Sequence, residues 1–166
     1  GLVVRAWRLV IYDVRSGRRL RGRAGTNLGP ADMAWSPNGK WLLASLERDS
    51  RVWKVKNGDL LATLLPGQRA YAPVVAWSPD SRLAGATGHD GTARVWSVGS
   101  GGAQLSGVYA ASASRDGLLG IGFGAKSDRL MVGSFDVEGQ VTVFDISPAG
   151  SAEVGTARSV PDWVGM

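Results

Sequence analysis

The chain has 166 residues, 44% hydrophobic and 20% charged, which suits one folded domain rather than a disordered chain. It contains no cysteine, which excludes disulfides and cysteine-ligated metal sites, and no apolar run reaches the roughly 18 residues of a membrane span. The net charge of +5 is uneven, because residues 1–56 hold 12 Lys/Arg and 4 Asp/Glu whereas residues 57–166 hold 7 and 10. The 24 glycines predict frequent turns between short strands.

One short β-type segment recurs along the chain. It reads RLVIYDV at 8–14, SRVWKV at 50–55, ARVWSV at 93–98 and VTVFDI at 141–146. Its aromatic residue is Tyr12, Trp53, Trp96 and Phe144 in turn, at spacings of 41, 43 and 48 residues. Self-similarity at a nearly fixed period predicts a repeat architecture.

A second series lies between these segments and completes the repeat. Trp35, Trp77 and Phe123 end strand-like runs, at spacings of 42 and 46 residues. The polar stretches SPNGK and SPDSR follow the two tryptophans and have the residue types of tight turns. A glycine-containing turn and a weaker strand follow the segments of the first series. The repeat is therefore four short strands in about 43 residues, as in one blade of a β-propeller.

The motifs WSPNG, WSPDS, GHDGTARVWSV and NGDLLATL resemble the WD40-repeat family over nearly the whole chain. The resemblance implies an all-β propeller of four-stranded antiparallel blades, in which the recurring aromatics are structural. The chain departs from the family where Gly67-Gln68 replaces the expected Gly-His, so the family's buried His–Asp–Ser–Trp network is incomplete. The expected structural aromatics are Tyr12, Trp35, Trp53, Trp77, Trp96, Phe123 and Phe144.

The repeat divides the chain into three full blades and two partial ones. The predicted units are 1–23 (three strands), 24–66, 67–107, 108–160 and 161–166, the last being the start of another blade. We interpret the chain as a fragment of a longer propeller, whose natural N-terminus is missing and whose open blade faces favour self-association. The alternative is a closed four-bladed ring, in which VPDWVGM at 160–166 pairs with the first unit.

The only histidine, His89, stands next to Asp90, which raises the question of a catalytic or metal-binding pair. Asp90 lies six residues before Trp96, and an acidic residue occupies that position in the other blades, as Glu47 and Glu138. Asp90 is therefore predicted to be a structural turn carboxylate that accepts backbone N–H groups or the Trp96 indole N–H. A metal site would need further converging ligands, so none is predicted.

Arginine is concentrated in one short stretch, at positions 15, 18, 19, 21 and 23 (Arg15, Arg18, Arg19, Arg21 and Arg23). A basic patch of this kind can bind nucleic acid or another acidic partner. The alternative is a solvated outer strand, where charge discourages edge-to-edge pairing. No aromatic residue lies among these arginines, so the stretch lacks the usual platform for stacking single-stranded bases.

The predicted function is binding of a protein or peptide at one loop face of the propeller, without catalysis and without a cofactor. The chosen residues are arginines, a tyrosine and a histidine of the loops that the resemblance places there: Arg48, Arg69, Tyr71, His89 and Arg115. The alternative is the propeller part of a hydrolase or lactonase whose active site lies in blades outside this sequence. The resemblance further suggests a bacterial protein, and such propellers accompany signalling domains such as protein kinases. A cytoplasmic location is expected as well.

Overall fold

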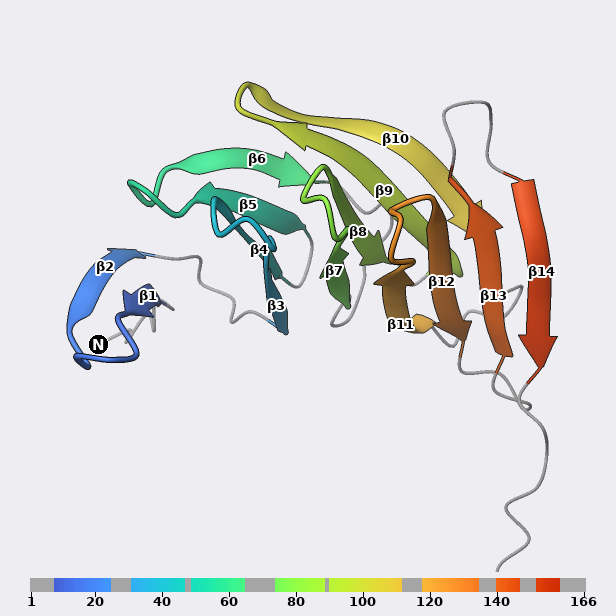
Figure 1. Ribbon diagram of the computed structural model, residues 1–166, viewed down its shortest axis with the longest axis horizontal. Helices are drawn as coiled ribbons and strands as arrows, with labels where there is room; N and C mark the ends of the chain where they lie inside the picture. Colours follow the sequence, from blue (N-terminus) through green and yellow to red (C-terminus); the bar gives the residue numbers. More distant parts are fainter. Residues whose placement is uncertain are drawn as a thin grey trace, which may run out of the picture.

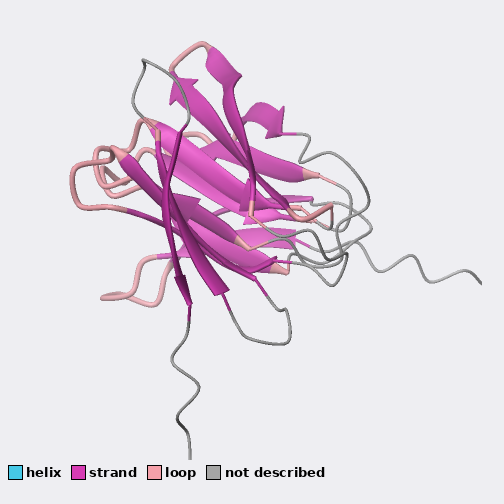
Figure 2. Cartoon of the chain, turned by 90° about the vertical axis from the view of Figure 1, so that its right-hand side faces the viewer, coloured by secondary structure: helices cyan, strands magenta, loops and turns pink. Residues whose placement is uncertain are grey.

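The computed structural model describes residues 8–24, 31–46, 49–64, 74–88, 90–111, 118–134, 140–146 and 152–158. Within these ranges all regular structure is β-strand, joined by turns (Figure 2). The strands form one two-stranded sheet and three four-stranded sheets, in which each strand pairs antiparallel with its neighbours in sequence. The predicted all-β class with four-stranded antiparallel blades is confirmed.

The sheets follow one another in chain order. The first hairpin consists of β1 (Arg8–Tyr12) and β2 (Arg19–Ala24). Blade 2 consists of β3 (Asp32–Trp35), β4 (Trp41–Ser45), β5 (Ser50–Lys54) and β6 (Leu60–Leu64). Blade 3 consists of β7 (Val75–Trp77), β8 (Leu83–Thr87), β9 (Thr92–Gly99) and β10 (Gly102–Ala110). Blade 4 consists of β11 (Leu118–Phe123), β12 (Arg129–Ser134), β13 (Gln140–Asp145) and β14 (Ala152–Arg158).

A buried serine organises the turn between the first two strands of blades 2 and 3. The backbone N–H of Trp41 donates to Ser36 Oγ at 2.9 Å, and that of Leu83 donates to Ser78 Oγ at 2.9 Å. These hydroxyls take up the first N–H of the returning strand, which would otherwise lack a partner next to the core. The serine of each Ser-Pro turn thus bonds the turn to the strand that follows it.

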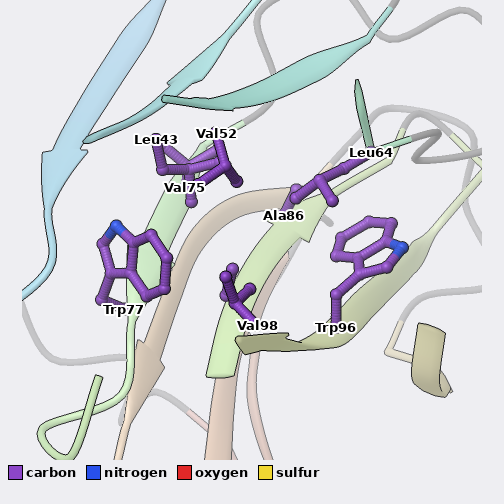
Figure 3. Packing of buried hydrophobic residues seen from close by; sticks show 9 residues of the cluster. Leu43, Val52, Leu64, Val75, Trp77, Ala86, Trp96 and Val98 are labelled. Carbon is purple, nitrogen blue, oxygen red and sulfur yellow. The ribbon is translucent and has the colours of Figure 1, made fainter. Parts of the chain in front are cut away.

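The blades stack through two apolar cores. The first lies between blades 2 and 3 and includes Leu43, Val52, Trp77 and Trp96 (Figure 3). The second lies between blades 3 and 4, where the rings of Tyr109 and Phe144 approach to 5.3 Å between centroids. Blade 3 is therefore covered on both faces. Burying apolar side chains between sheets is the main stabilising term of this architecture.

The described sheets lie along an open arc (Figure 1). The β1–β2 hairpin and β14 stand at its opposite ends, so the described strands do not form the closed four-bladed ring considered above. The chain is a partial β-propeller. The expected blade boundary after residue 107 falls inside β10, which continues to Ala110 past an irregularity in its pairing between Leu105 and Gly107.

Candidate functional site

The sequence predicts the binding residues in loops at one end of the blades. All five lie outside the described residues, as do two of the three expected turn carboxylates: Arg48, Arg69, Tyr71, His89, Arg115, Glu47 and Glu138. The described residues beside these loops show how the end of each blade is held. They include Asp90, the carboxylate for which the sequence predicts a structural role.

Asp90 is bound through both carboxylate oxygens. Thr92 donates to Oδ1 from its backbone N at 3.2 Å and from Oγ1 at 2.6 Å. Arg94 donates from Nη2 to Oδ2 at 2.8 Å and from Nη1 to Oδ1 at 3.3 Å. Burial raises the pKa of Asp90, but the hydrogen bonds from Arg94 and Thr92 outweigh it and lower the pKa below its usual value. The sequence predicted the Trp96 indole N–H as one possible donor to Asp90. Among the described hydrogen bonds, the side-chain donors to Asp90 are Arg94 and Thr92.

Blade 2 carries a second Asp–Arg ion pair, whose arginine has the same strand position as Arg94. Arg51 donates to Asp49 Oδ2 from Nη2 at 3.0 Å and from Nε at 3.3 Å. Arg51 and Arg94 each lie two residues before the tryptophan of their strand, in the repeated letters RVW. Neither arginine was among the predicted site residues, although this repetition was the signal for both. Their side chains are 29% and 16% exposed, so each arginine is held at the loop end by its ion pair and is partly open to solvent.

Two buried polar atoms at this end of blade 2 have no hydrogen-bond partner among the described residues. They are Asp49 Oδ1 and Ser50 Oγ. An unpartnered buried hydroxyl costs free energy, because it gives up water without replacement. The loop end of blade 2 is therefore less completely bonded than that of blade 3, where Asp90 uses both oxygens.

The recurring aromatics do not all share one environment. Trp77, Trp96 and Phe144 are buried, and Trp53 and Phe123 are half-buried. Tyr12 and Trp35, by contrast, are 57% and 50% exposed. Their expected place in a core or seam is therefore not what the structure shows. The reason for Trp35 is positional, since β3 is the first strand of blade 2 and the unit before it has two strands, β1 and β2, among the described residues (Figure 1).

The basic stretch lies on the first hairpin. Arg15, Arg18 and Arg19 are exposed, and Arg21 and Arg23 lie in β2. The turn is fixed by Asp13 Oδ1, which accepts the Ser16 backbone N–H and hydroxyl, each at 2.7 Å. These hydrogen bonds lower the pKa of the Asp13 carboxyl.

Other candidate sites are few in the described part of the chain. An open groove of about 620 Å³ lies under the β9–β10 turn, with Arg82, Ser97 and Gln104 among its lining residues. The described residues contain no group of three or more His, Asp or Glu side chains placed to hold a metal ion. They also contain no helix long and apolar enough to cross a membrane.

The sequence pattern of the WD40 family, described as the WD domain or G-beta repeat, matches residues 24–54 and 58–97. These ranges cover most of blade 2 and of β7–β9. The chain carries WD40 repeats. Arg51 and Arg94 thus occupy the same position in two matched WD40 repeats, whereas Asp49 lies two residues nearer its tryptophan than Asp90 does.

Curated relatives with WD40 repeats match only part of the chain. The WD repeat and SOCS box-containing protein 1 of Homo sapiens is 28% identical over 93 residues, which are 55% of this chain and 22% of that protein. The small ribosomal subunit protein RACK1y of Oryza sativa subsp. japonica is 34% identical over 96 residues, 54% of this chain and 28% of that protein. The chain therefore spans about a quarter of the length of these relatives. Both are eukaryotic, so a bacterial origin stays a prediction.

A solved structure shows the same fold over most of the chain. It is a protein from Bacteroides uniformis assigned as a 6-phosphogluconolactonase, with a TM-score of 0.69 and 16% identity. The match covers 90% of this chain and 50% of that one. At this identity the likeness shows the fold alone, and it adds nothing to the alternative of a lactonase-type enzyme.

Proposed function

We propose that the chain is a non-catalytic interaction module that binds a protein or peptide at the loop end of its WD40 repeats. The observation that carries the proposal is the recurrence of WD40 repeats in a stacked arc of blades. Rigid blades hold loops in fixed relative positions, and loops on such a scaffold are the usual place of recognition. The name of the rice relative, a small ribosomal subunit protein, supports a role within an assembly.

The proposed binding surface combines loop and framework residues. Arg69 and Tyr71 are the main candidates, since arginine and tyrosine are favoured anchors of protein interfaces. Arg48, His89 and Arg115 extend this surface. The arginine side chains of the two ion pairs, 29% and 16% exposed, would border it and favour an acidic or carbonyl-rich partner segment. A cytoplasmic location stays a prediction.

Affinity purification with matched variants tests this function. We expect some proteins to be retained by the wild-type chain and by Lys126→Ala, but lost from the double variant Arg69→Ala/Tyr71→Ala. Lys126 is a suitable control because it is exposed on the turn before β12, away from the loop end. If the folded double variant retained every partner of the wild type, the proposed surface would be wrong.

The exposed arginines of the first hairpin support a second candidate, binding of nucleic acid or another polyanion. Phosphate contacts by arginine release counterions, so such binding weakens steeply as salt rises. The candidate predicts strong salt dependence and loss of binding in the variant Arg19→Glu/Arg21→Glu. Binding that is insensitive to both changes would reject it.

A further inference from the structure

The outer strand of blade 3 has an open edge. The strand order in this blade is β10-β9-β8-β7, so β10 pairs with β9 on one side only and lies on the outer side of the arc (Figure 1). Such a strand presents a row of unpaired backbone N–H and C=O groups, which can pair with another strand. Blade 3 packs on blade 2 through one core and on blade 4 through the other. The exposure of its outer strand therefore does not depend on the two ends of the arc.

The other outer strands have features that discourage pairing, and β10 has few of them. The sequence of β2 includes Arg19, Arg21 and Arg23, that of β14 includes Glu153 and Arg158, and β6 has only five residues. β10 has nine residues, GAQLSGVYA, of which none is charged and none is proline. Charge, proline and shortness are common protections of a sheet edge. Among the described outer strands, β10 is thus the best suited to receive another strand.

The hydrogen bonds between β9 and β10 show which backbone groups face the open edge. The N–H of Ala111 donates to the Gly91 carbonyl at 3.0 Å, so Ala111 turns its backbone groups toward β9. These directions alternate along an antiparallel strand, and the pairing is regular from Gly107 to Ala110. Val108 and Ala110 therefore turn their N–H and C=O groups away from β9. A partner strand can bond to them without breaking any hydrogen bond of the blade.

The irregularity in β10 brings two exposed apolar side chains to the same face. The pairing shifts between Leu105 and Gly107, so Leu105 lies opposite Trp96 and Val108 lies opposite Arg94. Trp96 and Arg94 are two residues apart on β9 and project from one face of the sheet, and Leu105 and Val108 do the same. Leu105 is 51% and Val108 47% exposed. Because Trp96 belongs to the core between blades 2 and 3, this face of β10 continues that core to the surface.

A groove adjoins the turn end of the same strand. Ala103 and Gln104 of β10 line the open groove described above, together with Ser97 and Val98 of β9. Apart from Arg82, the residues that line it are uncharged. A chain that pairs along β10 therefore has room to continue beside the hairpin, in surroundings as neutral as the strand itself.

We propose that β10 is a second binding surface, where an extended segment of a partner protein adds to blade 3 as a fifth strand. The segment is uncharged and has apolar side chains at alternate positions, because these lie beside Leu105 and Val108, where a charge would lose water without gaining a partner. Backbone hydrogen bonds supply the affinity, and the alternate side chains supply the selectivity. The surface lies on an outer strand rather than in the loops, so it is separate from the binding function proposed above.

A peptide library displayed on phage, with the purified 166-residue chain as the target, tests the proposal. We expect the selected peptides to share an uncharged run with apolar residues at alternate positions. Binding of a synthetic copy of one of them should change the amide chemical shifts of Val108 and Ala110. The loop variant Arg69→Ala/Tyr71→Ala should bind these peptides as the wild type does, which separates this surface from the loop end.

Val108→Pro separates the edge from the fold. Proline removes the N–H that points to the open edge, and the ladder between β9 and β10 does not use that group. We expect a folded chain whose affinity for the selected peptides falls by about tenfold or more. Val108→Thr is the matched control, because it keeps the N–H and the shape of the side chain, and it should still bind. Val108→Lys is a second test, since it leaves the backbone intact and places a charge at the edge; it should bind as weakly as the proline variant.

Three results would overturn the proposal. The first is a selection that yields no peptide able to bind the wild-type chain. The second is equal affinity of the selected peptides for the wild type, Val108→Pro and Val108→Lys. The third is a wild-type dimer in sedimentation velocity that Val108→Lys dissociates, because the strand added to β10 would then come from a second copy and not from a different protein.

Discussion

At the scale of single residues, two equally buried serines of blade 2 differ in their bonding. Ser45 Oγ accepts the Asp32 N–H at 2.9 Å and donates to the Asp32 carbonyl at 3.3 Å. Ser50 Oγ has no partner among the described residues. We predict that Ser50→Ala leaves the free energy of unfolding unchanged or raises it by about 1 kcal/mol, whereas Ser45→Ala lowers it by about 1–2 kcal/mol.

Urea denaturation of the two alanine variants measures this difference. Both serines are fully buried, so the loss of side-chain volume is the same and only the hydrogen bonds differ. Equal losses of stability in the two variants would show that the Ser50 hydroxyl is bonded after all.

Asp90 makes a pH-dependent contribution to stability. Its pKa is lowered in the folded state by hydrogen bonds from Arg94 and Thr92, despite burial. The contribution is therefore present above the unfolded pKa of about 3.9 and is lost as the pH falls through the lower folded value. We predict that Asp90→Asn lowers the stability by about 1 kcal/mol at neutral pH. Thermal unfolding from pH 7 to pH 3 should show the gap between wild type and variant closing. A gap that stays constant would contradict this role.

At the scale of elements, the contact between β8 and β11 depends on a missing side chain. A Cβ on Gly85 would lie 2.7 Å from Ile121 Cδ1 and 3.1 Å from Phe123 Cε2. We predict that Gly85→Val destabilises the protein by about 1–3 kcal/mol, because it overfills the seam between blades 3 and 4. Gly99→Val is the control, since a Cβ there meets nothing within 4 Å. Chemical denaturation measures both, and similar stabilities for the two variants would contradict the argument.

The repeat allowed much of this architecture to be predicted. Trp77 and Trp96 recur one period after Trp35 and Trp53, and the length of the period indicates four strands per blade. The burial of each recurring aromatic side chain was not predictable in the same way. Trp35 and Trp77 occupy equivalent sequence positions, yet one is half exposed and the other buried, because burial depends on which blade lies beside them.

The candidate site was less predictable than the fold. The position six residues before the strand aromatic identified Asp90 correctly as a bonded turn residue. The spacing of residues along the repeat did not show that Arg51 pairs with Asp49, two residues away. It also did not show that Arg94 is the partner of Asp90. Side-chain pairing within a short turn depends on reach and direction, and these are not fixed by spacing in the sequence.

At the scale of the whole molecule, stability should be highest in the middle of the arc. Blade 3 shares one core with blade 2 and another with blade 4, whereas blade 4 is packed on one face only among the described residues. In stacked repeats, stability is the sum of each unit and its interfaces with its neighbours. We therefore predict that amides of β8 and β9 exchange with solvent more slowly than those of β12 and β13, although all four are inner strands of their sheets.

Hydrogen–deuterium exchange of the wild-type chain is the measurement. The two pairs of inner strands are compared within the same molecule, so each serves as the control for the other. Slowest exchange in β12 and β13 would contradict stabilisation by stacking, since these strands carry the exposed Met131 and Val141.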